Sequence, residues 1–235
     1  MADDSGGLSS LRLPSGRPLF DPGNAEQRRV GLLHSVLLVL VSFLCGGLFL
    51  SVGSGGLQVA GIGAETPAGQ IVETAANFLG LGVAPLVYLA WRADWSLVGF
   101  GKPSRRDVVV TLLGIGALVA FMQAGETLLT ALGYTPATNE AVQTGRQNPE
   151  LFLYYIPIVL LLNSPAEELL FRGVVQGLLR RAYGVVPGIL GAGAIFGVVH
   201  YSALVAAGSA GAYVVLAVGS GLILGVLYEY AENLL

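Results

Sequence analysis

Six predominantly apolar stretches follow one another along the chain. They span residues 30–56, 70–91, 108–133, 151–180, 185–206 and 210–230. About 20 apolar residues in an α-helix cross the hydrocarbon core of a bilayer, so each stretch predicts a membrane helix. The third stretch also holds two polar residues, Gln123 and Glu126. The pattern predicts an all-α fold, a polytopic integral membrane helical bundle with about six transmembrane helices.

Composition supports a membrane protein. The 235 residues are 54% hydrophobic and 11% charged, whereas soluble domains contain about 25% charged residues. The net charge of −3 is too small to indicate a partner, and the basic residues are scattered through loops, which argues against nucleic-acid binding. The single cysteine, Cys45, excludes a disulfide framework and a cysteine-based metal site.

The number of Lys and Arg residues alternates between high and low from one predicted loop to the next. They are frequent before the first stretch, at 92–107 and at Arg180 and Arg181, but absent from 57–69. Cytosolic loops carry the excess of Lys and Arg, so the N-terminus is predicted to be cytosolic in a multi-pass protein of the cell membrane. Residues 1–29 are polar and lack the early apolar core of a signal peptide, which predicts a flexible cytosolic tail.

A polar cluster follows the apolar start of the fourth stretch. Two adjacent carboxylates, Glu167 and Glu168, are followed by Arg172. A charge at the centre of a membrane helix costs roughly 2.5–3.5 kcal/mol, and such groups usually face the protein interior or a water-filled cavity. Ser164, Pro165 and Glu167 also fit a helix start, with Ser as N-cap, Pro at the first helical position and Glu two residues later. Capping does not explain Glu168 and Arg172, whose side chains meet on a helix because they are four residues apart.

His200 ends the next apolar stretch, four residues after Phe196 on one helical face. A membrane histidine is often a hydrogen-bonding group between helices, which is the interpretation for His34. However, a carboxylate and an imidazole from neighbouring helices can converge on one water molecule. These two groups are the minimum for general-base hydrolysis.

The two motifs carry a family resemblance. Glu-Glu-x-x-Phe-Arg at 167–172, followed by Phe-x-x-x-His at 196–200, resembles the CAAX-processing and bacteriocin-processing intramembrane proteases, also called the CPBP or Abi family. The resemblance covers about 150–233. It implies an intramembrane endopeptidase that cleaves a peptide or protein substrate at the lipid bilayer, such as a prenylated CAAX protein or a leader peptide.

The resemblance also implies residue roles. Glu167 would activate water for attack on a peptide carbonyl, and Glu168 would support it and pair with Arg172. His200 would bind the same water or steady the oxyanion, while Phe171 and Phe196 would pack the site. One Glu and one His are fewer than the three protein ligands of a catalytic zinc site, so no cofactor is expected and zinc is disfavoured.

The predicted domain organisation has three parts. Residues 1–29 form the tail, 30–150 the N-terminal membrane helices, and 151–235 a CPBP-like catalytic membrane domain. Family members carry a further His-containing motif on a later helix, and no His follows His200 here, so this domain is expected to lack its last helix. That absence keeps a second function open, a non-catalytic membrane scaffold or bacteriocin-immunity-type protein. A proton-coupled transporter is a third, but the chain shows only one Pro-interrupted polar site, at Pro165, rather than a pair.

Overall fold

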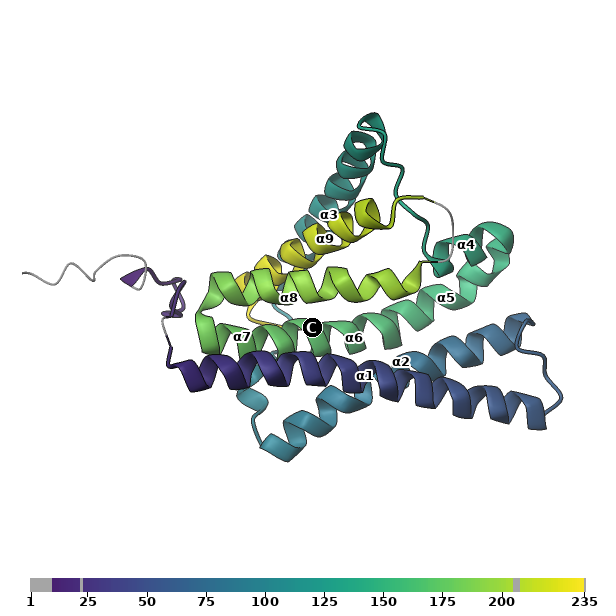
Figure 1. Ribbon diagram of the computed structural model, residues 1–235, viewed down its shortest axis with the longest axis horizontal. Helices are drawn as coiled ribbons and strands as arrows, with labels where there is room; N and C mark the ends of the chain where they lie inside the picture. Colours follow the sequence, from purple (N-terminus) through teal and green to yellow (C-terminus); the bar gives the residue numbers. More distant parts are fainter. Residues whose placement is uncertain (1–9, 22, 205–207, 235) are drawn as a thin grey trace, which may run out of the picture. The chain divides into compact units, whose positions relative to one another are not determined.

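Long apolar helices dominate the fold. A computed structural model describes residues 10–21, 23–204 and 208–234 of the chain. The longer helices are α1 (Ala25–Val59), α2 (Pro67–Arg92), α3 (Arg105–Ala131), α8 (Val185–Val199) and α9 (Ala210–Ala231) (Figure 1). With the short helix η6 (His200–Ala203) continuing α8, all five are long and apolar enough to cross a membrane. The predicted all-α polytopic fold is confirmed.

The fourth apolar stretch is helical but segmented. It consists of α5 (Phe152–Ile158), the π-helix η4 (Val159–Asn163), α6 (Ser164–Glu167), the π-helix η5 (Glu168–Val175) and α7 (Gln176–Tyr183), which follow one another without a break. The six apolar stretches of the sequence therefore correspond to five long spans and this segmented one. A further helix, α4 (Glu140–Gln147), lies in the polar connection before it.

The predicted helix start at Ser164 is wrong. Asn163 and Ser164 both have helical backbone angles, with φ −64° and ψ −59° at Asn163, and no side chain caps this position. Pro165 has no N–H to give to the helix and its ring crowds the preceding turn. The π-helix η4 ends at Asn163, two residues before Pro165, and so includes the preceding turn that the proline ring crowds. The chain therefore continues as a helix through Pro165 instead of starting one there.

The chain divides into two compact units. Unit 1 comprises Met1–Ser35, Leu97–Asn139 and Phe171–Leu235, and unit 2 comprises Val36–Ser96 and Glu140–Leu170. In unit 1, α8 packs between α7 and α9, and α9 also packs along α3 (Figure 1). Glycines on α8 face side chains of α9, which lets the two helices approach closely, as small residues do in membrane proteins.

The segment before α1 is bonded to the junction between α7 and α8. The backbone N–H of Asp21 donates to the carbonyl of Tyr183, and the N–H of Val185 donates to Pro18. Gly184 forms the junction with φ +96°, a conformation that favours glycine. The described residues of this segment, which composition predicted to be flexible, are thus attached to α7 and α8, which lie between η5 with Arg172 and η6 with His200.

The segment before α1 is also attached to α9, through the buried carboxylate of Glu229. The side chain of Glu229 is 3% exposed. Arg180 Nη1 donates to it at 2.6 Å, Gln176 Nε2 at 2.9 Å and Arg17 Nη1 at 3.0 Å. The sequence indicated Arg180 only as a marker of orientation and did not predict this cluster. Gln176 and Arg180 stand on one helical face four residues apart, but only the fold brings them to Glu229.

In unit 2, α2 packs against the segmented helix. Tyr155 and Gln70 lie 3.4 Å apart at their side-chain oxygens, and Gly82 allows Ala166 to come close to the α2 backbone. The Ser54 hydroxyl donates to Glu73 at 2.5 Å, so this membrane carboxylate has a partner. The contacts of α2 with Tyr155 and Ala166 position α6, which carries Glu167.

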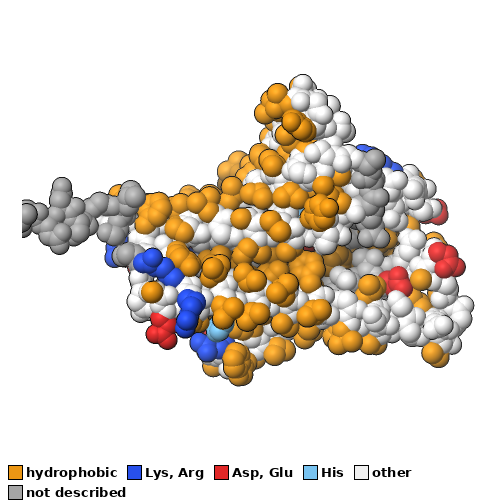
Figure 2. Space-filling view, in the orientation of Figure 1, with side chains coloured by type: hydrophobic (Ala, Val, Ile, Leu, Met, Phe, Trp, Pro, Cys, Tyr) orange, Lys and Arg blue, Asp and Glu red, His pale blue; other side chains and the backbone are white. Residues whose placement is uncertain are grey.

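Large apolar side chains cover much of the visible surface, and charged side chains form a few patches (Figure 2). The exposed leucines and valines of α1 and α3 are typical of helices that face lipid rather than water.

Candidate active site

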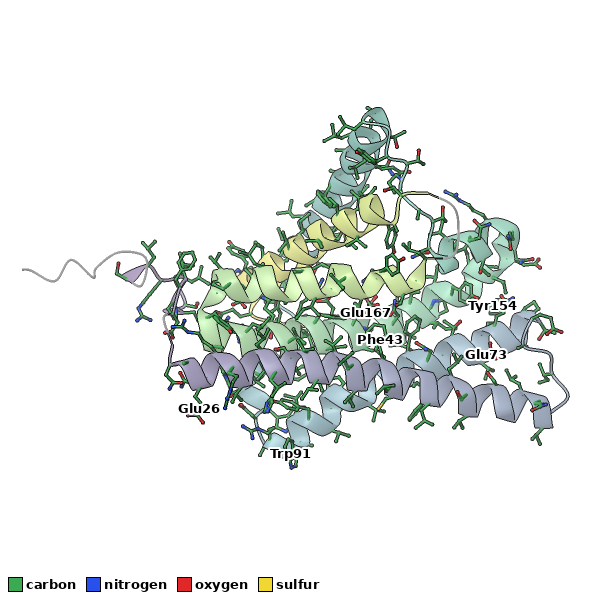
Figure 3. All side chains as sticks on the ribbon, in the orientation of Figure 1. Glu26, Phe43, Glu73, Trp91, Tyr154 and Glu167 are labelled. Carbon is green, nitrogen blue, oxygen red and sulfur yellow. The ribbon has the colours of Figure 1, made fainter. Side chains whose placement is uncertain are left out.

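The paired carboxylates lie at a change of helical geometry in unit 2. Glu167 is the last residue of α6 and Glu168 the first residue of the π-helix η5 (Figure 3). Both side chains are half-buried, while Ala166 and Leu169 on either side of them are buried. Single π-turns inside α-helices are frequent at functional sites. The two carboxylates are therefore partly accessible, while the residues directly before and after them are packed.

Arg172 belongs to unit 1 and is buried against an aromatic ring. It is 1% exposed, and its guanidinium carbon lies 4.3 Å from the centroid of the Phe196 ring. Phe171 meets the same ring edge-on, with centroids 5.1 Å apart. A desolvated cation over an aromatic ring gains about 2 kcal/mol or more, which offsets part of the cost of burying the charge. Phe196 thus packs against both Phe171 and the Arg172 side chain; the pairing of Arg172 with Glu168 stays a prediction.

His200 also contacts Phe196. The two ring centroids are 4.1 Å apart, and Nδ1 of His200 lies 2.7 Å from the carbonyl oxygen of Phe196. A carbonyl oxygen only accepts hydrogen bonds, so Nδ1 carries the hydrogen and donates it. In the neutral ring, Nε2 then presents a lone pair. His200 is therefore oriented to accept a hydrogen bond at Nε2.

The structure brings together one half of the predicted site. Phe171, Arg172, Phe196 and His200 form a single cluster in unit 1, with Phe196 at its centre. The other half of the predicted site is Glu167 and Glu168. These two residues belong to unit 2, close to the point after Leu170 where the chain enters unit 1. Sequence spacing predicted that Phe196 and His200 share a face, but not that Arg172 stacks on the same ring.

No metal centre is apparent among residues 10–21, 23–204 and 208–234. No three of their His, Cys, Asp or Glu side chains lie in an arrangement that could hold a metal ion. A metal-free site stays a prediction.

The long apolar helices are those of a membrane-embedded protein, and the segment that carries both motifs is similar to a protease family. Residues 149–235 match the family model for type II CAAX prenyl endopeptidase Rce1-like proteins, and this segment includes both motifs. For this segment the match confirms the resemblance that the motifs indicated, to a protease family that acts on protein substrates at the membrane. No curated protein and no solved structure matches the chain.

Proposed function

We propose that this protein is an intramembrane endopeptidase in which Glu167 is the general base. Glu167 takes a proton from a water molecule, and the resulting hydroxide attacks the carbonyl carbon of the scissile peptide bond. When the C–N bond breaks, the same proton passes to the leaving amine, which leaves one new carboxyl end and one new amino end. The observation that supports this most is the half-buried carboxylate pair at a π-turn, within the segment that matches the protease family.

His200 orients the attacking water in this proposal. Its Nδ1–H is engaged by the Phe196 carbonyl, so Nε2 accepts a hydrogen bond from the water and directs an oxygen lone pair at the substrate. This tautomer favours the water-binding role over the oxyanion role, because a neutral Nε2 has no hydrogen to donate. Arg172 and Phe196 act through their neighbours and are positioning residues.

The proposed substrate is a membrane-associated peptide with a CAAX-type end, including a prenylated one, or a leader peptide. The N-terminus is proposed to be cytosolic, which follows from the distribution of Lys and Arg. No metal takes part in the proposed reaction.

Cleavage by the purified protein in liposomes tests the assignment of the base. A prenylated CAAX-type peptide and a leader peptide, each with a fluorophore and quencher, serve as substrates. Glu167→Gln removes the base while keeping the size of the side chain, so we expect cleavage to fall by about 10²-fold or more. Glu150→Gln, at an exposed glutamate of the same unit, is the matched control and should cleave at the wild-type rate.

Two results would contradict the proposal. Wild-type activity in Glu167→Gln would show that another group activates water. If folded wild-type protein cleaves neither peptide, the proposed endopeptidase activity is contradicted and the scaffold or immunity-type alternative is favoured.

A further inference from the structure

The proposed reaction needs a hydrogen-bond donor that its named residues do not supply. When hydroxide attacks the peptide carbonyl, the carbonyl oxygen becomes an oxyanion, and donors aimed at that oxygen are usually the largest single contribution to catalysis. Glu167 holds the proton that goes to the leaving amine. Neutral His200 accepts at Nε2, because its Nδ1–H is engaged by the Phe196 carbonyl. A further group close to Glu167 therefore has to donate to the oxyanion.

Asn163 lies one helical turn before Glu167, and both residues belong to unit 2. Asn163 ends η4, and the four residues of α6 (Ser164–Glu167) continue the helix from it. Both side chains are half-buried. Side chains four residues apart on a helix share a face, with their Cβ atoms about 5–6 Å apart. Helical side chains also lean toward the N-terminus, which brings the Glu167 carboxylate toward Asn163.

Neither of the usual structural roles of an asparagine in a membrane helix accounts for Asn163. Asparagine is a preferred N-cap residue, but Asn163 has helical backbone angles and its side chain makes no capping bond. An asparagine that joins two membrane helices uses its amide in a hydrogen bond between them. Among the residues that the structure describes, the enclosed Oδ1 of Asn163 has no hydrogen-bond partner. A buried acceptor without a donor costs about 1–3 kcal/mol, so this side chain is retained at a cost to stability.

The chemistry of the amide suits the missing donor. Side-chain amides are among the donors that stabilise oxyanions, and the amide is neutral, so it avoids the cost of a charge at membrane depth. The enclosed end of the Asn163 amide is its oxygen. This leaves Nδ2, which carries two hydrogens, as the polar atom that can reach a substrate.

We propose that Asn163 is a catalytic residue that donates from Nδ2 to the oxyanion, an inference that rests on the proposed function. One helical turn then presents both groups that act on the scissile carbonyl. Glu167 delivers hydroxide to the carbonyl carbon, while Nδ2–H of Asn163 binds the carbonyl oxygen as it becomes charged. No covalent bond to Asn163 forms or breaks, and its hydrogen stays on nitrogen. When the C–N bond breaks, the oxyanion becomes part of the new carboxyl end.

Steady-state cleavage of the fluorogenic peptides in liposomes tests this role. Asn163→Leu keeps the approximate shape of the side chain but has no donor, so kcat should fall by about 10²–10³-fold. KM should not change, because the hydrogen bond strengthens only as charge develops. Asn163→Gln retains an amide and should recover part of the lost kcat. Asn77→Leu is the matched control, since Asn77 is a half-buried asparagine of the same unit whose amide lies against Gly46 of α1; it should have the wild-type kcat.

A sulfur substitution in the substrate tests the contact itself. Sulfur in place of the scissile carbonyl oxygen is a weaker hydrogen-bond acceptor. Its effect on intrinsic reactivity is common to all variants and cancels in a double-mutant cycle. The slowing caused by sulfur should be about tenfold smaller in Asn163→Leu than in wild type. A residue that only supports the fold would leave this effect unchanged.

Stability supplies an independent measurement. By SDS titration in mixed micelles, Asn163→Leu should be at least as stable as wild type, because it removes an enclosed acceptor that lacks a donor. A clear loss of stability would instead show that the amide is structural and would overturn the inference.

The outcomes separate this inference from the proposed function. If Glu167→Gln does not cleave but Asn163→Leu has the wild-type kcat, the role of Asn163 is overturned and the base assignment stands. Equal sulfur effects in wild type and Asn163→Leu would overturn it in the same way. If wild-type protein cleaves neither peptide, or Glu167→Gln cleaves at the wild-type rate, the proposed function fails, and the inference about Asn163 fails with it.

Discussion

The stacking of Arg172 on Phe196 predicts a measurable coupling between two buried side chains. The two groups are 1% and 6% exposed, and the guanidinium lies 4.3 Å from the ring centroid. We expect Arg172→Met and Phe196→Leu each to destabilise the protein, and the double variant to lose less than the sum of the two. Because both side chains are desolvated, the coupling should be about 2 kcal/mol.

A double-mutant cycle isolates this interaction from the others at the same ring. The edge-on contact between Phe171 and Phe196 contributes about 1 kcal/mol, but it is lost in every variant that lacks Phe196 and therefore cancels. The hydrophobic term is also small, since a membrane helix that leaves its neighbours remains in an apolar environment. What remains is the attraction of the cation to the ring.

Reversible unfolding in mixed micelles, followed by SDS titration, supplies the four free energies of unfolding. Arg106 and Tyr230 provide the matched control cycle, because they form the same kind of contact at 4.5 Å. Tyr230 is exposed, so that coupling should not exceed about 1 kcal/mol. A coupling between Arg172 and Phe196 near zero, or no larger than the exposed pair's, would refute the reasoning.

Four further predictions concern stability, cofactor and orientation. Glu229→Gln should lower the free energy of unfolding by about 3–5 kcal/mol because it leaves buried arginine charge uncompensated. Glu232→Gln, at a half-exposed partner of Arg17, should cost less than about 1 kcal/mol in the same titration. Gly184→Ala should cost about 1–3 kcal/mol, since φ is +96° and the new Cβ would lie 2.7 Å from backbone atoms; Gly47→Ala, in open space, should be close to neutral by thermal unfolding. EDTA or phenanthroline should leave peptide cleavage unchanged, and inhibition reversed by zinc would contradict the metal-free proposal. A protease added outside intact spheroplasts should spare an N-terminal tag, and removal of the tag would reverse the predicted orientation.

The long helices were predictable because the bilayer imposes a simple rule on sequence. The predicted stretch 210–230 corresponds to α9 at Ala210–Ala231, and 70–91 corresponds to α2 at Pro67–Arg92. Apolar runs of bilayer length, bounded by glycine, proline or charge, leave little choice of structure. The N-cap prediction at Ser164 failed because Ser-Pro-x-Glu fits both a helix start and a helix interior. The π-turn that decides between them leaves no local signal.

Within the candidate site, the motifs identified the residues but not their contacts. A spacing of four placed Phe196 and His200 on one face, as the structure has them. The stacking of Arg172 on Phe196 depends on how η5 and α8 pack, which spacing does not specify. The same holds for Arg17 and Glu229, which are 212 positions apart in the chain and meet only through the fold.

The proposed mechanism requires Glu167 and His200 to share one water molecule, and an intramolecular cross-link tests this requirement directly. A Cys45→Ser chain carrying Glu167→Cys and His200→Cys is treated in liposomes with a short bifunctional thiol reagent, and the linked peptides are identified by mass spectrometry. Glu167→Cys with Val198→Cys is the control, because Val198 is exposed and lies on the other side of α8 from His200. The proposed mechanism predicts a cross-link in the first pair and none in the control. If both cysteines of the first pair react with a monofunctional maleimide but never with each other, the two side chains do not share a water molecule, and the proposed mechanism is contradicted.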